Sequence, residues 1–346
     1  MCGSIYFGFI SNETDPHNHL KLFGLVFIKQ IKSNYYPTSV FLQIIKKYLK
    51  FFIFSILLIG IFIQENPCLA QSSKNKNLIV TLLAAGQGDS IVIQTPKGKT
   101  YLIDTGPNET LFGGSFDAGK EAVVPFLKFN KIAFLDGILI THPHLDHYGG
   151  TFTVLENFKV KQFMDSGIKT RAPPYIKLLS QLEKNGVEYK IVKEKDKLNW
   201  ERSLKIEILA PTKELAPNIE EKNNVNNRSI VLKLTYKSVS FLFTGDIEKE
   251  TEEVLAKKLK RKLKSKILKV AHHGSKTSST MVFLMRVDPE VALLSCGVKN
   301  PFGHPHALIL NRFNDLGVKI YRTDQDGTIQ IITDGKKYEV KTSKGS

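Results

Sequence analysis

The sequence predicts a mixed α/β fold in which β-sheets pack against each other and helices cover them. Strand-like and helix-like segments alternate between residues 78 and 341, in a mixed order that suggests packed sheets. With 346 residues, of which 42% are hydrophobic, the chain is long enough to bury a full core. No sequence period typical of a solenoid or a propeller recurs, which argues against repeat architectures.

The first half of this region consists of short β-rich runs separated by turn sequences such as GQGD and PKGK. Its last buried strand, DGILIT, leads directly into a cluster of histidines. We expect strands at 78–84, 90–95, 100–105 and 136–141, and helices at 119–129 and 173–186.

The second half continues the alternation after a polar loop, 211–227, that is rich in Asn, Glu and Lys. The runs SIVLKLTY and SVSFLFTG follow this loop and predict a hairpin. We expect strands at 187–192, 204–209, 229–236, 238–245, 266–271 and 290–295, a strand pair within 318–340, and helices at 248–264, 278–287 and 305–316.

The helix predicted at 248–264 carries much of the positive charge. Leu255, Leu259 and Leu263 are spaced four residues apart and predict one core-facing stripe. No aromatic residues are interleaved with its lysines, so we interpret these lysines as a solvated outer face rather than a nucleic-acid surface.

The first 70 residues have the character of a targeting segment. A basic patch at 44–50 precedes an apolar run of 13 residues at 51–63, and the small residues of CLA at 68–70 resemble a cleavage site. Because a spanning helix needs about 20 apolar residues, this run is short for a permanent anchor. The predicted organisation is an N-terminal extension (1–38), a signal peptide or membrane anchor (39–70), a polar linker (71–77) and one large domain (78–341).

The position of this signal-like segment is unusual, because such a segment is expected near the first residue. No methionine lies between Met1 and Met164. One hypothesis is that translation starts at a non-AUG codon near Val40 or Leu42. The alternative is a genuine extension in which residues 20–31 form a second membrane-seeking stretch.

The segment predicts an exported protein, periplasmic or extracellular, that residues 51–63 could keep at a membrane. Cleavage after Ala70 would leave Cys296 as the single cysteine, because Cys2 and Cys68 lie upstream. An intramolecular disulfide would then be impossible, so stability would depend on the core and on bound metal.

The chain is strongly basic, with 49 Lys and Arg against 33 Asp and Glu and a net charge of +16. This excess favours anionic partners such as nucleic acid or a membrane surface. A generally basic protein with no such partner is an equally good interpretation of charge alone, and nothing in the sequence indicates a protein partner.

Seven of the nine histidines lie in three short motifs that follow apolar strands. The motifs are THPHLDHYGG at 141–150, HHGSKTSS at 272–279 and NPFGHPH at 300–306. Asp104 and Asp246 also end apolar strands, in YLIDTG and FLFTGD. Polar residues at strand ends are expected to meet at one rim of the sheets, which is where sites are built on a rigid scaffold.

The spacing of the first motif suits metal binding. His142 and His144 alternate as they leave a strand and can reach one ion, while Asp146 and His147 can reach another. Neutral imidazole and carboxylate are ligands for Zn²⁺ and, with more oxygen, for Mn²⁺. A further carboxylate, such as Asp246, can bridge two ions that together generate a hydroxide at neutral pH.

These ordered motifs resemble the metallo-β-lactamase-fold superfamily and, more narrowly, the metallo-hydrolase domain of the ComEC competence family. The resemblance extends from about Leu78 to Thr333. It implies a four-layer αββα sandwich with two divalent metal ions, Zn or Mn, at the rim of the sheets, and a hydrolase that uses a metal-bound hydroxide.

Carried over to this chain, the resemblance implies that His142 and His144 hold the first metal and that Asp146 and His147 hold the second. Asp246 would bridge the two ions. Together with His304, discussed below, Asp146 and Asp246 are the residues expected to act in catalysis.

The resemblance also implies partners for these ligands. His272 would complete the second site, and His273 is the lesser candidate because it lies one step further from the strand. Asp104 would orient a metal-binding histidine. Gln87 and Asp89 match the narrower family, although a glycine-flanked Asp is also ordinary turn chemistry.

The chain departs from most of the superfamily at one ligand. A first-site histidine is expected about 20 residues before Asp246, but no histidine lies between His147 and His272. Asn226 or Asn227 stands at that place. An amide oxygen is a harder and weaker ligand, so Mn²⁺ or partial occupancy of the first site becomes plausible. Asp165, at the end of VKQFMD, could supply a compensating carboxylate, although a helix N-cap or a turn is the more common role.

The two remaining motifs are expected to line the substrate side. Ser275, with Ser278 and Ser279, offers hydroxyls near a helix start, where they could bind an anion or simply cap the helix. His304 could contact a phosphate or protonate a leaving oxygen. Asn300 belongs to the same motif, and a purely structural role in this turn is nearly as well supported.

The sequence therefore predicts an exported metal-dependent hydrolase, with a phosphodiesterase or nuclease acting on nucleic acid as the leading hypothesis. Hydrolysis of other esters or lactones is an alternative, because the fold does not determine the substrate. A second alternative is a non-catalytic, metal-stabilised module that binds DNA and assists its uptake.

Overall fold

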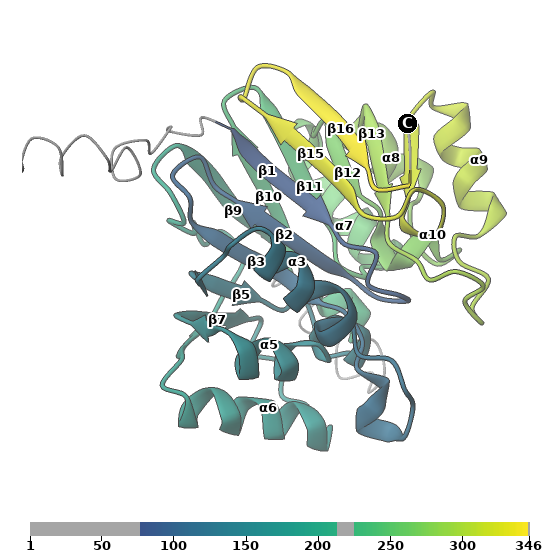
Figure 1. Ribbon diagram of the computed structural model, residues 1–346. Coiled ribbons are helices and arrows are strands. Elements are labelled where there is room, and N and C mark those ends of the chain that lie inside the picture. The colour runs from purple at the N-terminus through teal and green to yellow at the C-terminus, as the bar shows by residue number, and fades with distance from the viewer. Residues whose placement is uncertain (1–76, 213–224, 345–346) are drawn as a thin grey trace, which may run out of the picture. The chain divides into compact units, whose positions relative to one another are not determined.

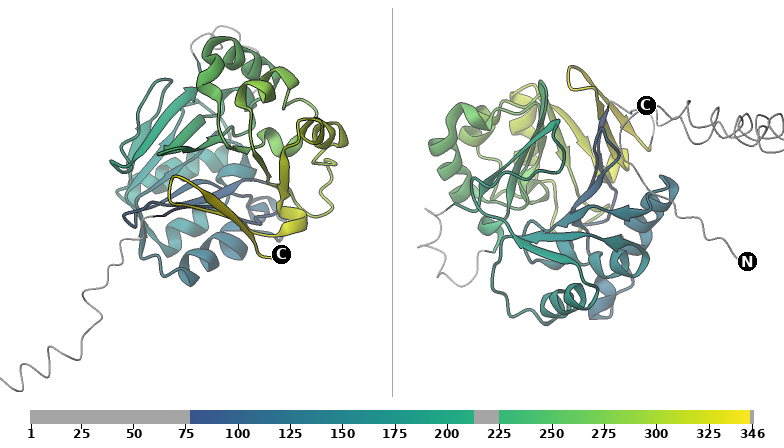
Figure 2. Two further views of the ribbon diagram at one scale, coloured as in Figure 1. Left: turned by 90° about the horizontal axis from the view of Figure 1, so that it is seen from above. Right: turned by 90° about the vertical axis from the view of Figure 1, so that its left-hand side faces the viewer.

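The computed structural model describes residues 77–212 and 225–344 (Figures 1 and 2). The expected N-terminal extension, the signal-like segment, the linker up to residue 76 and most of the polar loop 211–227 lie outside the described residues. Within the described ranges, no helix is both long and apolar enough to span a membrane.

The first sheet has eight strands in the order β16-β15-β1-β2-β3-β5-β7-β8 (Figure 1). The strands from β16 to β3 pair antiparallel, and those from β3 to β8 pair parallel. Their bounds are β1 Leu78–Leu82, β2 Ser90–Gln94, β3 Thr100–Thr105, β5 Gly137–Leu139, β7 Gln162–Asp165, β8 Glu188–Ile191, β15 Ile329–Thr333 and β16 Tyr338–Thr342.

The second sheet has six strands in the order β14-β13-β12-β11-β10-β9. The β9–β10 and β10–β11 pairs are antiparallel, and the strands from β11 to β14 are parallel. Their bounds are β9 Leu204–Ala210, β10 Val231–Tyr236, β11 Val239–Phe243, β12 Ile267–Lys269, β13 Val291–Leu294 and β14 Lys319–Arg322; β4 Phe134–Leu135 and β6 Lys159–Val160 form a separate short pair.

Three buried apolar clusters define four layers. One cluster lies between the two sheets, one between the first sheet and helices α3, α5 and α6, and one between the second sheet and helices α7, α8 and α9 (Figures 1 and 2). The αββα sandwich that the resemblance implied is therefore confirmed. The helices are α3 Val124–Phe129, α4 Leu145–Tyr148, α5 Thr151–Asn157, α6 Pro173–Lys184, α7 Lys249–Leu259, α8 Met281–Val287, α9 Ala307–Asp315 and α10 Thr323–Asp326.

The strands at the centre of the first sheet are buried on both faces. In β3, Ile103 packs between the sheets and Leu102 packs against the helices, and Ile91 and Val92 divide in the same way in β2. Successive side chains of a strand point to opposite faces. This two-sided burial explains why these strands read as nearly continuous apolar runs in the sequence.

The helix expected at 248–264 is present as α7 followed by a 3₁₀ turn, Lys260–Leu263 (η7). Leu255 and Leu263 are buried, and Leu259 packs against the same cluster. The predicted core-facing stripe is therefore confirmed. The lysines at 257, 260 and 262 are exposed, as expected for a solvated outer face.

Two parts of the element prediction were wrong. The segment expected as one strand pair within 318–340 contains β14, which joins the second sheet, and the β15–β16 hairpin, which joins the first. Periodicity does not say which sheet a strand will join. The short helix α5 and the strand β7 were not anticipated, because α5 has only seven residues and too few turns for a helical pattern.

The motif residues gather at one edge of the sandwich. The carboxyl ends of β3 and β5 lie side by side in the first sheet, and those of β11 and β12 in the second, because each pair is parallel. Asp104, the His142 segment, Asp246 and the His272 segment leave these four strand ends. Parallel pairing thus brings together residues that are far apart in the sequence.

Candidate metal centre

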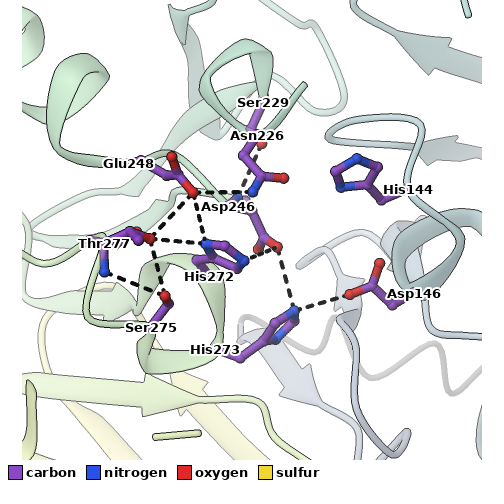
Figure 3. Close-up of polar contacts among 12 residues, drawn as sticks. His144, Asp146, Asn226, Ser229, Asp246, Glu248, His272, His273, Ser275 and Thr277 are labelled. Carbon is purple, nitrogen blue, oxygen red and sulfur yellow. Dashed lines mark hydrogen bonds and ion pairs between the residues drawn. The ribbon is translucent and has the colours of Figure 1, made fainter. Parts of the chain in front are cut away.

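Histidine and carboxylate side chains from three connections converge at this edge (Figure 3). His142 and His144 lie between β5 and α4, and Asp246 follows β11. His272 and His273 lie in a 3₁₀ turn, Ala271–Gly274 (η8), that follows β12. Both backbones in this turn are left-handed, with φ of 49° and 53°.

The tightest group consists of Asp146, His147, Asp246 and His273, whose ligand atoms all lie within 4.8 Å of one another. His147 Nε2 is 3.2 Å from Asp246 Oδ2. His273 Nε2 is 3.3 Å from Asp146 Oδ2 and 3.5 Å from Asp246 Oδ2. Three of the four side chains are buried, so the group forms one enclosed set of metal-ligand atoms.

The histidine that joins this group is His273, whereas the sequence analysis favoured His272. His272 is partly exposed, and its Nε2 lies 3.9 Å from Asp246 Oδ2 while its Nδ1 faces Glu248 at 3.4 Å (Figure 3). The expectation assumed that the chain continues straight from β12. The left-handed turn instead sends the second histidine inward.

A second pair of potential ligands lies beside this group. His142 Nε2 is 3.0 Å from His144 Nδ1. His142 Nδ1 is 3.1 Å from Thr141 Oγ1 and 3.2 Å from Ser229 Oγ. Burial lowers the pKa of both histidines, and the neighbouring His147 lowers that of His142 further. Both rings are therefore neutral at pH 7, the state in which imidazole binds a metal.

Of the two asparagines considered for the missing histidine, Asn226 is the one with a spare oxygen. Asn226 Nδ2 donates to Glu248 Oε1 at 3.3 Å, and its buried Oδ1 has no hydrogen-bond partner among the described residues. Figure 3 shows this oxygen on the side of His144. Asn227 Oδ1 instead accepts the Glu248 N–H at 2.9 Å and the Thr251 hydroxyl at 2.8 Å, so it serves the start of α7.

Asp104 lies behind His147, in the orienting position that was expected. Its Oδ2 is 2.7 Å from His147 Nδ1 and accepts the Thr141 hydroxyl at 2.8 Å, while its Oδ1 accepts the Thr141 N–H at 2.7 Å. These contacts fix the imidazole so that Nε2 faces the centre. Burial raises the pKa of Asp104, with partial compensation by His147.

Asp89, in the GQGD turn, lies beside His273, which the Ser295 carbonyl orients. Asp89 Oδ1 is 3.4 Å from His273 Nδ1, which also donates to the Ser295 carbonyl at 3.0 Å. A Cβ at Gly88 would collide with the carbonyl oxygen of Asp146. The glycine therefore lets this turn pack directly against the HxHxDH loop, which ordinary turn chemistry alone would not explain.

Sequence reasoning missed Lys269. This side chain is fully buried in β12, contacts Asp89, and lies 4.0 Å from Asp246 Oδ1. Burial lowers the pKa of Lys269, but the two carboxylates outweigh that effect and raise it, so the group is a fixed cation. The available signal was a lysine inside the otherwise apolar strand KILKVA, since buried lysines need an acidic partner.

The electrostatics of the centre hold its acids in the charged form. Burial by itself would raise the pKa of Asp246, but His147 and His273 outweigh it and hold the pKa well below its usual range. Burial likewise opposes protonation of His147, yet Asp246, Asp146 and Asp104 raise its pKa well above its usual value. The buried carboxylates and imidazoles of this group therefore stabilise each other's charged forms.

The donor set fits divalent metal ions. Asp246 Oδ1 and Asn226 Oδ1 are buried and have no hydrogen-bond partner among the described residues. Buried oxygens in that state cost free energy unless a cation or donor is supplied. Imidazole nitrogens and carboxylates converge within 4.8 Å beside them, and these are the ligand types of zinc and manganese sites.

His304 lies at the rim of the centre. Its ring centroid is 5.8 Å from that of His272 and 6.3 Å from that of His273. Gln87 Oε1 accepts the Gly297 N–H at 3.0 Å, which turns its amide nitrogen towards His304 Nδ1 at 3.5 Å. Burial, with the charge of the nearby histidines, lowers the pKa of His304 to about 4. The ring is neutral at pH 7.

Asn300 holds the loop that carries His304. Its Nδ2 donates to the carbonyls of Gly297 and His304, at 3.0 and 2.6 Å, and its Oδ1 accepts the His304 N–H at 3.0 Å. With both ends of its amide occupied inside the loop, Asn300 braces the backbone. The structural interpretation of this asparagine is the one that fits.

The serines considered as an anion site serve other contacts. Ser275 Oγ faces Thr277 Oγ1 at 3.1 Å, and Ser278 donates to the carbonyl of Ile247. The N–H groups of Ser279 and Thr280, before α8, donate to the buried carboxylate of Glu252 at 2.6 and 2.7 Å. The anion position at this helix start is thus filled by the protein itself.

Asp165 also has a structural role. Its carboxylate accepts the hydroxyls of Tyr175 and Tyr189 at 2.6 and 2.8 Å and the N–H of Gly167 at 2.7 Å. These contacts engage both oxygens, and Asp165 belongs to neither group of potential metal ligands among the described residues. Asp165 therefore does not compensate for the missing first-site histidine.

Comparison with known proteins gives a family for this fold. A family model described as the metallo-beta-lactamase superfamily matches residues 83–298. The ComE operon protein 3 of Bacillus subtilis is 34% identical over 274 residues, which are 76% of this chain and 33% of that protein. The competence protein ComA of Neisseria gonorrhoeae is 29% identical over 278 residues, 80% of this chain and 35% of that protein.

The chain thus spans about a third of the length of the curated relatives it matches. Among solved structures, a variant of the CmlA beta-hydroxylase covers 73% of this chain and 53% of its own length, with 13% sequence identity and a TM-score of 0.49.

Proposed function

Because the chain belongs to the metallo-β-lactamase superfamily, we propose that residues 78–341 form a metal-dependent hydrolase that cleaves phosphodiester bonds in nucleic acid. One observation carries the proposal. Buried ligand atoms of Asp146, His147, Asp246 and His273 converge within 4.8 Å, next to the neutral pair His142 and His144. A purely structural acid cluster would not need two adjoining sets of ligands.

The residues would hold two divalent ions, Zn or Mn. The first ion would be held by His142, His144 and the Asn226 oxygen. The second ion would be held by Asp146, His147 and His273. Asp246 would contribute to both sites. His272 remains at the edge, where it can face substrate. When bound, such ions lower the pKa of a water molecule and neutralise charge that develops on phosphate oxygens.

The chain's own residues would orient the reacting groups. Asp104 and the Ser295 carbonyl hold the imidazoles of His147 and His273 in fixed orientations. The Gln87 amide nitrogen lies 3.5 Å from His304 Nδ1, which favours the neutral tautomer with its proton on Nε2. His304 would therefore assist a leaving oxygen with a hydrogen bond, which is a weaker contribution than the proton transfer expected from the sequence.

A basic cavity next to the centre supports a polyanionic substrate. It has a volume of about 610 Å³ and lies where β7, β8 and β9 end, at the same edge as the metal centre. Lys169, Lys193 and Lys195 line it, and none of the three forms an ion pair with another described residue. Glu194, also in the lining, is paired with Lys258 at 2.7 Å.

The similarity to competence proteins supports nucleic acid as the substrate, because competence concerns DNA. The segment 39–70 would direct export of the domain or anchor it at a membrane, and the composition of that segment supports this part of the proposal. N-terminal sequencing of the exported protein tests it. A first residue near Gln71 is expected after cleavage.

A non-catalytic DNA-binding module is the alternative function, and the basic cavity favours it equally. The metal centre argues for catalysis, because binding alone needs no adjoining ligand sets with unsatisfied oxygens. Esters and lactones would fit the same centre, but they would make no use of the three lysines.

The experiment is a metal add-back assay. The purified protein is stripped with a chelator, reloaded with Zn²⁺ or Mn²⁺, analysed for metal per chain, and assayed on bis-p-nitrophenyl phosphate and on an oligonucleotide. About two ions and metal-dependent cleavage of both substrates are expected. Oligonucleotide binding without cleavage under any loading would instead establish the binding module.

A further inference from the structure

The loop between β13 and α9 presents one apolar ring to solvent. Phe302 is 67% exposed, although it lies in the motif NPFGHPH beside the metal centre. Single exposed apolar side chains are common on protein surfaces. Phe302 differs from such residues in its contacts rather than in its exposure.

The backbone that carries Phe302 is held in place. Three hydrogen bonds of Asn300 close the turn from Gly297 to His304. The Gly297 N–H also donates to Gln87 Oε1 at 3.0 Å, which ties the loop to the GQGD turn. The backbone that carries Phe302 is therefore fixed before any ligand binds, which lowers the entropy lost on binding.

The ring continues a series of rings that begins at the metal ligands. Phe302 lies nearly parallel to His304, with centroids 5.8 Å apart and an interplanar angle of 25°. His304 in turn lies nearly parallel to His273, at 6.3 Å and 28°. Phe302 is therefore the outermost member of a series that leads from a metal ligand to the surface.

We propose that Phe302 is the platform on which an unpaired nucleobase of the substrate stacks, next to the phosphodiester that the centre cleaves. This inference rests on the proposed function and specifies its substrate class. Bases stack on aromatic side chains regardless of sequence, because every base has a π-face. In a duplex both faces of a base are covered by its neighbours, so an open platform selects single strands or frayed ends.

The adjacent Lys299 is consistent with this assignment. It is exposed and has no ion pair with another described residue. A lysine beside a stacking platform can contact the phosphate of the stacked nucleotide, as in other single-strand binding sites. The platform and the lysine cavity would then both contact the strand outside the metal centre.

Two substitutions separate stacking from packing. Phe302→Leu keeps apolar bulk and removes the π-face, whereas Phe302→Trp keeps a ring. Phe129→Leu is the matched control, because Phe129 is also an exposed phenylalanine, at 87%. It is the last residue of α3 and lies near the start of β5, at the edge of the sheet opposite the metal centre. Each variant is assayed on bis-p-nitrophenyl phosphate, which has no nucleobase, on a single-stranded oligonucleotide and on its duplex.

Phe302→Leu is expected to lower kcat/KM on the single strand roughly ten-fold, and to leave the small diester within about two-fold. Phe302→Trp should retain activity on the single strand, and Phe129→Leu should change neither substrate. Equal losses on the small diester and the oligonucleotide would overturn the proposal, because Phe302 would then act by positioning His304. Unchanged kinetics on every substrate would also overturn it.

Failure of the proposed function would be recognised separately. If the wild type cleaves no phosphodiester with either metal, oligonucleotide binding is measured by fluorescence anisotropy in the full chain and in Phe302→Leu. Weaker binding of the single strand, roughly ten-fold, would retain the platform on a non-catalytic module. Unchanged binding would overturn the platform as well.

Discussion

The molecule buries carboxylates in two regions that lie in different surroundings. At the metal centre, Asp246 is close to ring nitrogens of His147 and His273, which hold its pKa well below the usual range although burial acts in the opposite direction. Before α8, Glu252 accepts only backbone and hydroxyl hydrogen bonds, and burial raises its pKa to about 7. Arg312 contributes only a weaker lowering.

The difference shows how a buried acid of a site is told from a structural one. Glu252 satisfies the N–H groups of Ser279 and Thr280, so both partners are complete without any ligand. Asp246 keeps one buried oxygen without a hydrogen-bond partner among the described residues. An acid that is charged, buried and incompletely satisfied favours a cation, whereas an acid satisfied by the backbone stabilises the fold.

The largest expected effect follows from removing the charge at the centre. Asp246→Asn should lower kcat/KM on phosphodiesters a thousand-fold or more, because a ligand worth several kcal/mol in the transition state is lost. The matched change Glu252→Gln should leave metal content unchanged. Both are checked by elemental analysis and by the diesterase assay. An Asp246→Asn protein with full activity would remove this residue from the metal centre.

The second effect concerns pH and stability at Glu252. Its pKa is about 7 in the folded protein against 4.5 as a free carboxyl, so the folded state binds the proton more tightly. The contribution of this group is fully present below pH 4.5 and is lost as the pH rises through 7. The loss amounts to roughly 3 kcal/mol of folding free energy.

Urea unfolding of the chelator-treated protein at pH 5 and pH 8 measures this loss. The wild type should lose stability relative to Glu252→Gln between these two pH values, because the amide cannot ionise. Glu253→Gln, the exposed neighbour, should follow the wild type. If the free energy of unfolding of Glu252→Gln depends on pH as that of the wild type does, the Glu252 carboxyl is already ionised at pH 5 and its pKa is not raised.

The third effect concerns Asp104, a carboxylate that contacts both the backbone and a histidine of the metal centre. Asp104 accepts a backbone N–H, as Glu252 does, but it also orients His147. Asp104→Asn should weaken metal binding by roughly 10- to 100-fold, the usual cost of losing a residue that orients a ligand. Competition with a chromophoric chelator measures the affinity.

The control for Asp104 is Asp136→Asn. Asp136 accepts the Thr100 N–H at 3.0 Å and Lys161 Nζ at 2.9 Å, just before β5 and beside the start of β3. This variant should alter stability and leave metal affinity unchanged. Equal losses of affinity in the two variants would mean that Asp104 acts only through the stability of the sheet.

Much of this arrangement could be predicted from the sequence. The mixed α/β class followed from alternating apolar segments, and the resemblance carried by the ordered motifs implied the four-layer sandwich. The HxHxDH spacing, Asp104 and Asp246 identified the strand ends that converge. These features are local, since each lies at the end of a strand that the apolar pattern already marks. Parallel pairing then brings them to one edge of the sandwich.

The remaining features depend on tertiary contacts. The inward position of His273 requires two left-handed residues in succession, which no pattern of residue types specified. The difference between Asn226 and Asn227 depends on which amide the start of α7 uses. Lys269 resembles any strand residue until Asp89, 180 positions earlier, is seen to contact it.

The smallest expected effect concerns exposed charges, the lysines that line the basic cavity. Unlike Lys269, Lys193 and Lys195 are exposed and screened by salt, so each should contribute modestly and only to a polyanionic substrate. The double change to Gln should raise KM for an oligonucleotide a few-fold at low salt, and should reduce the salt dependence of binding by about one phosphate contact per lysine.

The small diester should be unaffected by this double change. The control is the same exchange at Lys97 and Lys336. Both residues are exposed and lie in turns at the edge of the sheet opposite the metal centre. If the control pair raises KM equally, the effect belongs to net charge, and the cavity has no specific part in binding the strand.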